Sequence, residues 1–163
     1  MKTLLLLRHG KSSWKETNLA DHDRPLKRRG INDALRMGEF LSSVGLIPDQ
    51  ICCSTAKRAK DTVKYLLETI HYEGEVLYSR ELYHGYTDDY INILNGVDNH
   101  HNSVMVVGHN PGLEEFVSTL SEIDEWLPTA AVVQIELAIC NWREIDDYSV
   151  GQIKNIWRPR ELF

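Results

Sequence analysis

The chain has 163 residues, of which 42% are hydrophobic, and a formal net charge of −6 at pH 7. This length fits one domain with one core, here residues 1–163, and the scattered basic residues offer no face to nucleic acid. The apolar residues 4–7 are far fewer than the ~20 of a membrane-spanning helix and lack a signal-peptide cleavage site, so we expect a cytoplasmic protein without membrane or nucleic-acid partners.

Apolar runs of strand length alternate with amphipathic helical stretches along the whole chain. The predicted strands are residues 2–7, 50–54, 76–78, 103–107, 132–138 and 151–157. The predicted helices are residues 27–44, 55–70, 88–95 and 113–120, whereas the polar residues 10–25 predict a loop. This alternation predicts an α/β fold, a single-domain three-layer α/β/α sandwich with a mainly parallel central sheet, and leaves open whether the later strands run antiparallel.

The three cysteines lie within or beside apolar runs. Cys52 and Cys53 are adjacent in the second predicted strand, and Cys140 stands alone in another apolar run. Their spacing provides neither a disulfide framework nor a CxxC zinc pair. We predict that all three are buried small side chains.

Short polar clusters follow three of the predicted strands. They are Arg8-His9-Gly10 after the first strand, Ser54-Thr55-Ala56-Lys57-Arg58 after the second and Gly108-His109-Asn110 after the fourth. Because ligands of open α/β sheets bind at the carboxyl ends of the strands, we expect two arginines and two histidines to meet at one edge.

A pair of guanidinium groups beside a pair of imidazoles suits a tetrahedral dianion, since the fixed forks of arginine match phosphate oxygens. Arg58 falls in the first turn of a predicted helix, where the helix dipole adds positive potential. Gly10 and Gly108 are expected to let the backbone approach a bound oxyanion, and their lack of a side chain permits strained dihedral angles at the strand exit. The sequence therefore predicts a phosphate site, and it contains no GxxxxGK[ST] motif of the P-loop kind.

The other histidines show no such pattern. His71, His100 and His101 are predicted to be solvated, while the positions of His22 and His84 relative to the site stay open. A metal hydrolase built on His9, His22, His84 and His109 is one alternative. It lacks a ligand signature such as HExxH, and we expect neither a metal nor another cofactor.

The three clusters, in this order and spacing, resemble the histidine phosphatase superfamily, also called phosphoglycerate mutase-like. The stretches RHGKSSW, DHDRPLKRRG, RMGEFL, LYHG and VGHNPGLEE are similar to its small SixA-type phosphohistidine phosphatase branch. The resemblance covers nearly the whole chain, and it implies the phosphoglycerate mutase-like fold.

The resemblance also implies roles for individual residues. His9 corresponds to the nucleophile that forms a phosphohistidine intermediate, and Arg8, Arg58 and His109 correspond to residues that bind the phosphoryl oxygens. Glu81 matches the position of the proton donor in larger relatives. Ser12 is a further candidate for substrate binding. Lys15 stands where related enzymes carry a polar residue such as asparagine, so its role is open.

The resemblance implies a metal-independent phosphatase that acts on protein phosphohistidine, with a histidine-containing phosphotransfer domain as a candidate partner. A short connection between the second and fourth strands predicts a shallow, open site that suits a phosphorylated side chain. The alternatives are a phosphomonoesterase for a small phosphorylated substrate and a catalytically silent phosphate-binding module. The basic residues 24–29 are a candidate docking surface for an acidic partner.

Overall fold

The computed structural model describes all 163 residues and contains one six-stranded sheet. The strands are β1 (Lys2–Arg8), β2 (Gln50–Ser54), β3 (Val76–Ser79), β4 (Ser103–Gly108), β5 (Val132–Leu137) and β6 (Gly151–Trp157). Their order in the sheet is β3-β2-β4-β1-β5-β6. The first four in this order are parallel, and β5 and β6 pair antiparallel. The mainly parallel sheet is confirmed, and of the later strands β5 runs antiparallel to both of its neighbours, β1 and β6.

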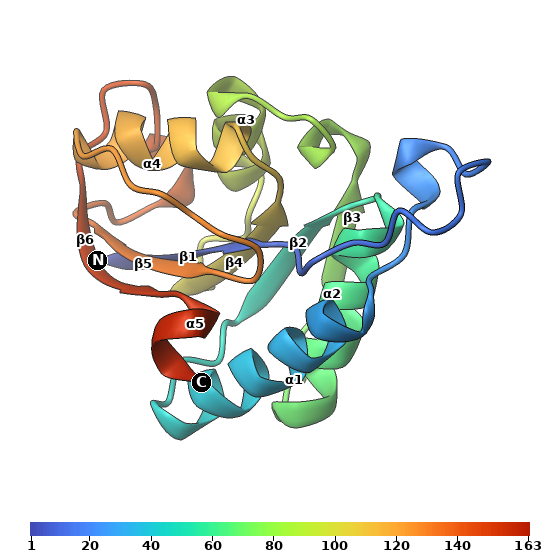
Figure 1. The fold of residues 1–163 in the computed structure, drawn as a ribbon. Coiled ribbons are helices and arrows are strands. Elements are labelled where there is room, and N and C mark those ends of the chain that lie inside the picture. The colour runs from blue at the N-terminus through green and yellow to red at the C-terminus, as the bar shows by residue number, and fades with distance from the viewer.

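Helices cover both faces of the sheet (Figure 1). The α-helices are α1 (Arg28–Ser43), α2 (Lys57–Thr69), α3 (Thr87–Asn95), α4 (Gly112–Ser121) and α5 (Pro159–Leu162). Short 3-10 helices are η1 (Asp21–Asp23), η2 (Arg80–Leu82) and η3 (Trp142–Glu144). Helices α3 and α4 lie on one face, with α1, α2 and α5 on the other, so the three-layer prediction is confirmed. Helix α5 is absent from the sequence-based prediction because four residues are too few for a helical period.

Strand β1 forms the centre of both cores. Leu4 and Leu6 pack with the α3 and α4 side, and Leu5 and Leu7 pack with the α1 and α2 side. Successive side chains of a strand point to opposite faces, so a continuous apolar run suits a strand that is covered twice. Each buried leucine stabilises the fold by roughly 1.5–3 kcal/mol.

The register of the sheet brings the polar clusters together. Arg8 is paired with Gly108 across β1 and β4, and Cys53 is paired with Val107 across β2 and β4. The carboxyl ends of β1, β2 and β4 are therefore level, and the residues that follow them share one edge of the sheet, as expected.

The prediction for the cysteines is correct at two positions and wrong at the third. Cys52 and Cys53 are buried in β2, whereas Cys140 is exposed. The reason is that β5 ends at Leu137, so Cys140 lies in the loop before η3 rather than in the sheet. None of the helices has both the length and the apolar character needed to cross a membrane.

Candidate active site

His9 follows β1 directly and is only 6% exposed. Its backbone N–H donates to the carbonyl oxygen of Gly108 at 3.2 Å, which holds the residue against the end of β4. The imidazole Nδ1 lies 2.7 Å from the carbonyl oxygen of Gly10. Because a carbonyl oxygen can only accept, Nδ1 carries the proton and Nε2 of the neutral ring keeps its lone pair.

His109 faces His9 from the end of β4. The two ring centroids are 4.9 Å apart with an interplanar angle of 51°. Nε2 of His109 shares a 2.8 Å hydrogen bond with the Ser54 hydroxyl at the end of β2. Its Nδ1 is buried and has no partner, although buried polar atoms are usually paired. The three strand ends therefore converge as predicted, and Nδ1 of His109 is left without a partner.

Both imidazoles are held in the neutral form. The pKa of His9 is lowered to about 3, mainly by burial and with help from the positive charges of Arg58 and Arg8, although the hydrogen bond to Gly10 opposes the shift. Burial also lowers the pKa of His109 to about 2, with contributions from His9 and Arg58. At neutral pH each ring is thus uncharged, which is the form that can act as a nucleophile.

Arg58 is buried in the first turn of α2 and is fixed by Asp21 of η1. Its Nη1 donates to the backbone carbonyl of Asp21 at 2.8 Å, and its Nη2 donates to Oδ2 of the same residue at 3.1 Å. The Tyr83 hydroxyl donates to that oxygen at 2.6 Å. Burial would raise the pKa of Asp21, but Tyr83, Arg58 and Arg24 outweigh it and hold the pKa below its usual range. Asp21 is therefore an anion that orients the Arg58 guanidinium.

Arg8 has far fewer partners. Its Nη1 donates to the carbonyl of Leu127 at 3.0 Å, while its Nε is buried without a partner. No carboxylate lies within 4.0 Å of its guanidinium. Burial lowers the pKa of Arg8, and nearby Glu114 opposes that shift, but an arginine remains charged under such conditions. Its charge is therefore available to an anion.

Gly10 and Gly108 are required for packing and are not strained. A Cβ on Gly10 would lie 2.9 Å from the backbone oxygen of Gly30, and a Cβ on Gly108 would lie 2.5 Å from the Tyr90 hydroxyl. The only glycine with a positive φ is Gly45, outside the site. Neither glycine adopts the strained dihedral angles that its lack of a side chain permits, and close contacts with α1 and α3 explain both glycines.

Thr62 connects two of the clusters. Its hydroxyl accepts from the backbone N–H of Gly10 at 2.9 Å and donates to the carbonyl of Arg58 at 2.6 Å. The loop after His9 is thereby tied to the first turns of α2. Thr62 belongs to the motif that follows β2, and it acts there as a positioning residue.

The loop after the first cluster is built around Arg24. This buried side chain donates to the Ser12 hydroxyl at 2.7 Å and forms a 3.1 Å ion pair with Asp21. Its guanidinium carbon lies 3.5 Å from the centre of the Trp14 ring. Ser12 is thus buried beside the site with its hydroxyl held by Arg24, and the exposed Lys15 side chain makes no hydrogen bond or ion pair. Because Arg24 is buried, the predicted docking surface at residues 24–29 is confined to residues 27–29.

Glu81 lies on η2, exposed, and its carboxylate makes no hydrogen bond or ion pair. Two other residues from this segment lie near the imidazole of His109. The Tyr83 ring is 5.6 Å from that of His109, and the His84 ring is 6.1 Å from it. The role of Glu81 as a proton donor stays a prediction.

The position of the remaining histidines is now defined. His22 bonds to the Thr55 hydroxyl at 2.8 Å and packs its edge against Tyr83, and His84 lies 3.8 Å from the Asp21 carboxylate. Both therefore border the site. No three His, Cys, Asp or Glu side chains converge in an arrangement suited to a metal ion, so the four histidines do not form a ligand set.

Part of the sequence matches the model of a known protein family. The model of the histidine phosphatase superfamily (branch 1) matches residues 4–85, which include the first two polar clusters. The chain belongs to the histidine phosphatase superfamily. It is a phosphatase of this family, in agreement with a site that combines two imidazoles and two guanidinium groups.

Similar proteins occur in plants and bacteria. A chloroplastic protein of Arabidopsis thaliana without an assigned activity is 33% identical over 153 residues, which cover 88% of this chain and 70% of that protein. A Mycobacterium tuberculosis protein, also without an assigned activity, is 28% identical over 86% of this chain and 92% of its own length. These relatives support the family without indicating a substrate.

Solved structures share the fold at lower identity. The protein histidine phosphatase SixA in complex with tungstate has a TM-score of 0.85 at 21% identity and covers 99% of both chains. A mycobacterial glucosyl-3-phosphoglycerate phosphatase has a TM-score of 0.69 at 14% identity and covers 95% of this chain and 98% of its own. The phosphoglycerate mutase-like fold is therefore confirmed.

Sequence reasoning missed the residues that support the predicted cluster. Asp21 and Tyr83 were given no role, and Arg24 was assigned to the surface. One signal was available, because DHDRP places acidic and basic residues together in the polar loop beside the first cluster, and such charges often pair. Tyr83 carries no comparable signal, since its contact with Asp21 joins segments 62 residues apart.

Proposed function

We propose that this phosphatase hydrolyses protein phosphohistidine through a covalent intermediate on His9, without a metal ion. The observation that carries the proposal is the state of the His9 ring. Nδ1 is occupied by the Gly10 carbonyl, burial keeps the ring neutral, and the lone pair of Nε2 is free. A neutral imidazole beside two cationic guanidinium groups suits attack on a phosphoryl group.

The reaction would proceed in two displacements. Nε2 of His9 attacks phosphorus, so that a new N–P bond forms while the bond from phosphorus to the leaving group breaks and the leaving atom takes a proton. Water then attacks the phosphorylated His9, which releases inorganic phosphate and returns the electron pair to Nε2. Arg8, Arg58 and His109 would hold the three equatorial oxygens, whose charge is stabilised without a metal.

Phosphohistidine as the substrate is supported by the small size of the site's surroundings. The phosphoryl pocket is the space bordered by His9, Arg8, Arg58 and His109. Only α2, β3, η2 and α3 connect β2 to β4, so no additional domain encloses this pocket. A ring nitrogen is a good leaving group once it is protonated, so this substrate depends little on a buried enzyme acid. The exposed position of Glu81 agrees with that, and a histidine-containing phosphotransfer domain is the partner we propose. The free cysteines suit a cytoplasmic location.

Hydrolysis of a small phosphate ester is the second candidate. It is supported by the fold shared with the mycobacterial glucosyl-3-phosphoglycerate phosphatase. Both candidates use the same covalent step, and they differ in the leaving group. A catalytically silent binding module would share the pocket but form no covalent intermediate.

A substrate panel in the presence of EDTA tests the proposal. It would contain a phosphohistidine peptide, a phosphohistidine-bearing phosphotransfer domain, sugar and glycerate phosphates, and p-nitrophenyl phosphate. We expect the phosphohistidine substrates to give the highest kcat/KM and His9→Ala to lose at least about 1000-fold on each substrate while its circular dichroism spectrum is retained. Wild-type protein that is inert on the whole panel would refute the proposal.

A further inference from the structure

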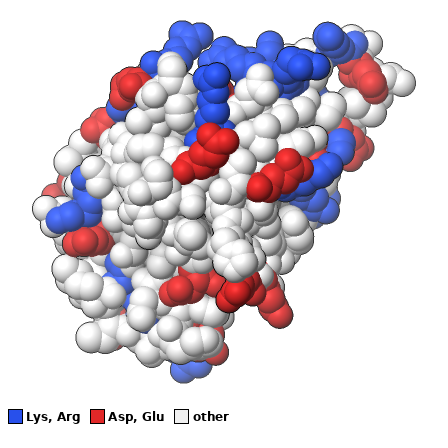
Figure 2. Space-filling model, turned by 90° about the horizontal axis from the view of Figure 1, so that it is seen from below, with Lys and Arg blue, Asp and Glu red and all other residues white.

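A second concentration of positive charge adjoins the phosphoryl pocket on the Arg8 side. A cavity of about 350 Å³ is lined by five cationic side chains, Arg8, Lys11, Arg29, Arg158 and Arg160, and by one carboxylate, Glu161. We call it the basic pocket. Lys and Arg side chains gather along the upper edge of the face in Figure 2, although the chain as a whole has a net charge of −6.

The walls of the basic pocket are fixed by backbone contacts. On one side the Lys27 N–H donates to the Lys11 carbonyl at 3.0 Å, and a Cβ on Gly30 would overlap that carbonyl, so α1 begins in tight contact with the chain after β1. This contact places Lys11 beside Arg29. On the other side Arg158 donates from Nε to the Trp126 carbonyl at 3.0 Å. These hydrogen bonds hold the cationic side chains close together despite their electrostatic repulsion.

Most of this charge is not neutralised within the chain. Arg8, Lys11 and Arg160 have no carboxylate within 4.0 Å, and the nearest carboxylate to Arg29 is Asp33 of its own helix at 3.8 Å. Only Arg158 is well paired, by Glu125 at 3.0 Å and by Glu161 of the pocket lining at 3.7 Å. Like charges held close without counterions are unfavourable, so an anion would be stabilised here.

The first turn of α1 adds to the positive potential. Helix N-termini favour acidic side chains and capping residues, yet the first turn of α1 has no acidic residue and its N-cap, Lys27, makes no side-chain cap. Lys27, Arg28 and Arg29 are exposed there instead. A basic surface thus continues outward from the pocket along the first turn of α1.

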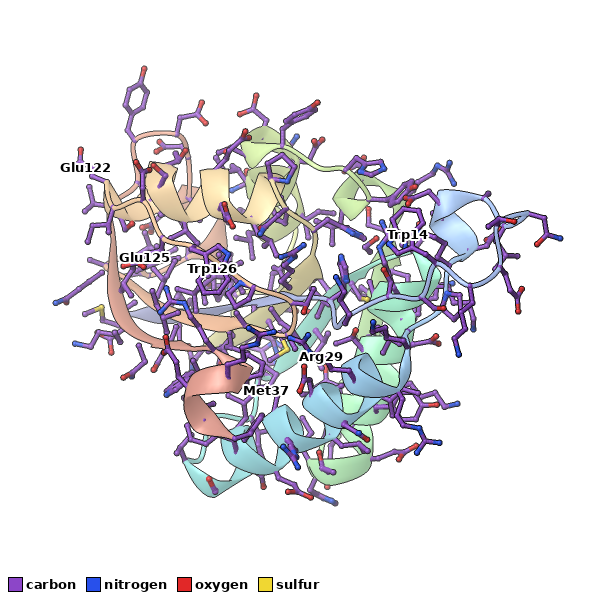
Figure 3. All side chains as sticks on the ribbon, in the orientation of Figure 1. Trp14, Arg29, Met37, Glu122, Glu125 and Trp126 are labelled. Atoms are coloured by element: carbon purple, nitrogen blue, oxygen red, sulfur yellow. The ribbon has the colours of Figure 1, made fainter.

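Trp126 forms an apolar wall of the basic pocket and is 63% exposed. Figure 3 shows it on the loop between α4 and β5, with Arg29 on the first turn of α1. Large exposed aromatic side chains are enriched where proteins bind partners. Trp126 therefore suits contact with the methylene groups of a bound side chain.

We propose that the basic pocket binds the carboxylate of an Asp or Glu residue that neighbours the phosphorylated histidine in the protein substrate. Arg8 borders both the basic pocket and the reaction centre, so the two anionic groups would bind next to each other. This inference rests on the proposed function, since it assigns a sequence preference to the same site.

The test begins with binding of peptides that carry no phosphate. A histidine peptide flanked by glutamates and a matched peptide flanked by glutamines are titrated into the protein, and the indole N–H of Trp126 is followed by NMR. We expect saturable binding of the glutamate peptide only, weakened at least tenfold in the double variant Arg29→Ala/Arg160→Ala. Arg143→Ala is the matched control, because Arg143 lies with residues 95–99 away from the basic pocket.

The second part uses phosphohistidine forms of the two peptides. We expect kcat/KM to favour the glutamate peptide at least tenfold in wild type and less than threefold in the double variant, whose folding is checked by its thermal midpoint. Equal binding of both peptides, or binding that the double variant retains, overturns the inference. A Trp126 shift with 3-phosphoglycerate but not with the glutamate peptide also overturns it. Glutamate-peptide binding without turnover of either phosphopeptide supports the basic pocket and refutes the proposed function.

Discussion

Two cavities of opposite charge lie on either side of the loop between α4 and β5. The one over α4 has a volume of about 550 Å³ and contains the carboxylates of Glu114, Glu115, Asp124 and Glu125. The basic pocket between α1 and α5 contains five cations. Figure 3 shows Glu125 and Trp126 next to each other on this loop, so the charge changes sign over a few residues.

The first turns of the four long helices also differ in the sign of their charged residues. The first turns of α3 and α4 carry acidic residues, whereas those of α1 and α2 carry none and begin with basic residues. Acidic side chains satisfy the N-terminal dipole of α3 and α4 within the protein, while α1 and α2 keep a positive potential that a ligand can satisfy. The local arrangement of charge therefore makes this edge positive, although the net charge of the chain is −6.

Among the substitutions that change the charge of these helix starts, removal of Arg58 should reduce activity the most. We expect Arg58→Ala to reduce kcat/KM by about 100- to 5000-fold, on the order of 3–5 kcal/mol of transition-state stabilisation, because a buried cation at the start of α2 is lost. Steady-state kinetics on p-nitrophenyl phosphate would measure the loss. Glu115→Gln, an exposed substitution at the start of α4, is the matched control and should stay within twofold; equal losses in both variants would contradict this assignment.

The buried imidazoles should make the fold sensitive to acid. The pKa values of His9 and His109, about 3 and about 2, lie below those of an unfolded chain, so the unfolded state binds more protons below pH 6.5. The free energy of unfolding should then fall as the pH drops below 6.5, with each histidine contributing up to about 1.4 kcal/mol per pH unit. Urea unfolding at pH 7.5, 6.5, 5.5 and 4.5 would show this slope, and His109→Gln should reduce it. An unchanged slope would argue against a neutral buried His109.

Asp21 should act through the orientation of Arg58. We expect Asp21→Asn to lower kcat about 10- to 100-fold, because the guanidinium loses its ionic partner, while inhibition by inorganic phosphate stays equal or becomes stronger. Asp23→Asn on the same short helix η1 is the control. A rise in KM and in the phosphate inhibition constant with kcat unchanged would instead indicate that Asp21 contributes to ground-state binding.

Among these substitutions, Glu81→Gln should change kcat/KM the least, and the size of the change should depend on the substrate. On phosphohistidine peptide we expect Glu81→Gln to change kcat/KM less than threefold, since the leaving nitrogen needs little help from an enzyme acid. On an alkyl phosphate ester the decrease should be larger. A large loss on the phosphohistidine peptide would show that this exposed carboxylate moves to the leaving group.

The sequence predicted those features that depend on local pattern. The leucine run of β1 and the periodicity of α1 fixed the layers, and the clusters around His9, Arg58 and His109 were predicted to meet because parallel strands share their carboxyl edge. The partners of these residues depend on contacts between distant segments. Asp21 with Tyr83, Gly10 with Gly30 and the exposure of Cys140 all follow from how loops pack on the sheet, which no local pattern encodes.

The most direct test is to find where the phosphoryl group goes during turnover. A ³²P-labelled substrate is mixed with enzyme, quenched in alkali within milliseconds, and the label is mapped by mass spectrometry and ³¹P NMR. The structure predicts an alkali-stable, acid-labile phosphoryl group on Nε2 of His9, because Nδ1 is bonded to the Gly10 carbonyl. Label on Nδ1, on another residue, or on no residue while phosphate is released would contradict the account.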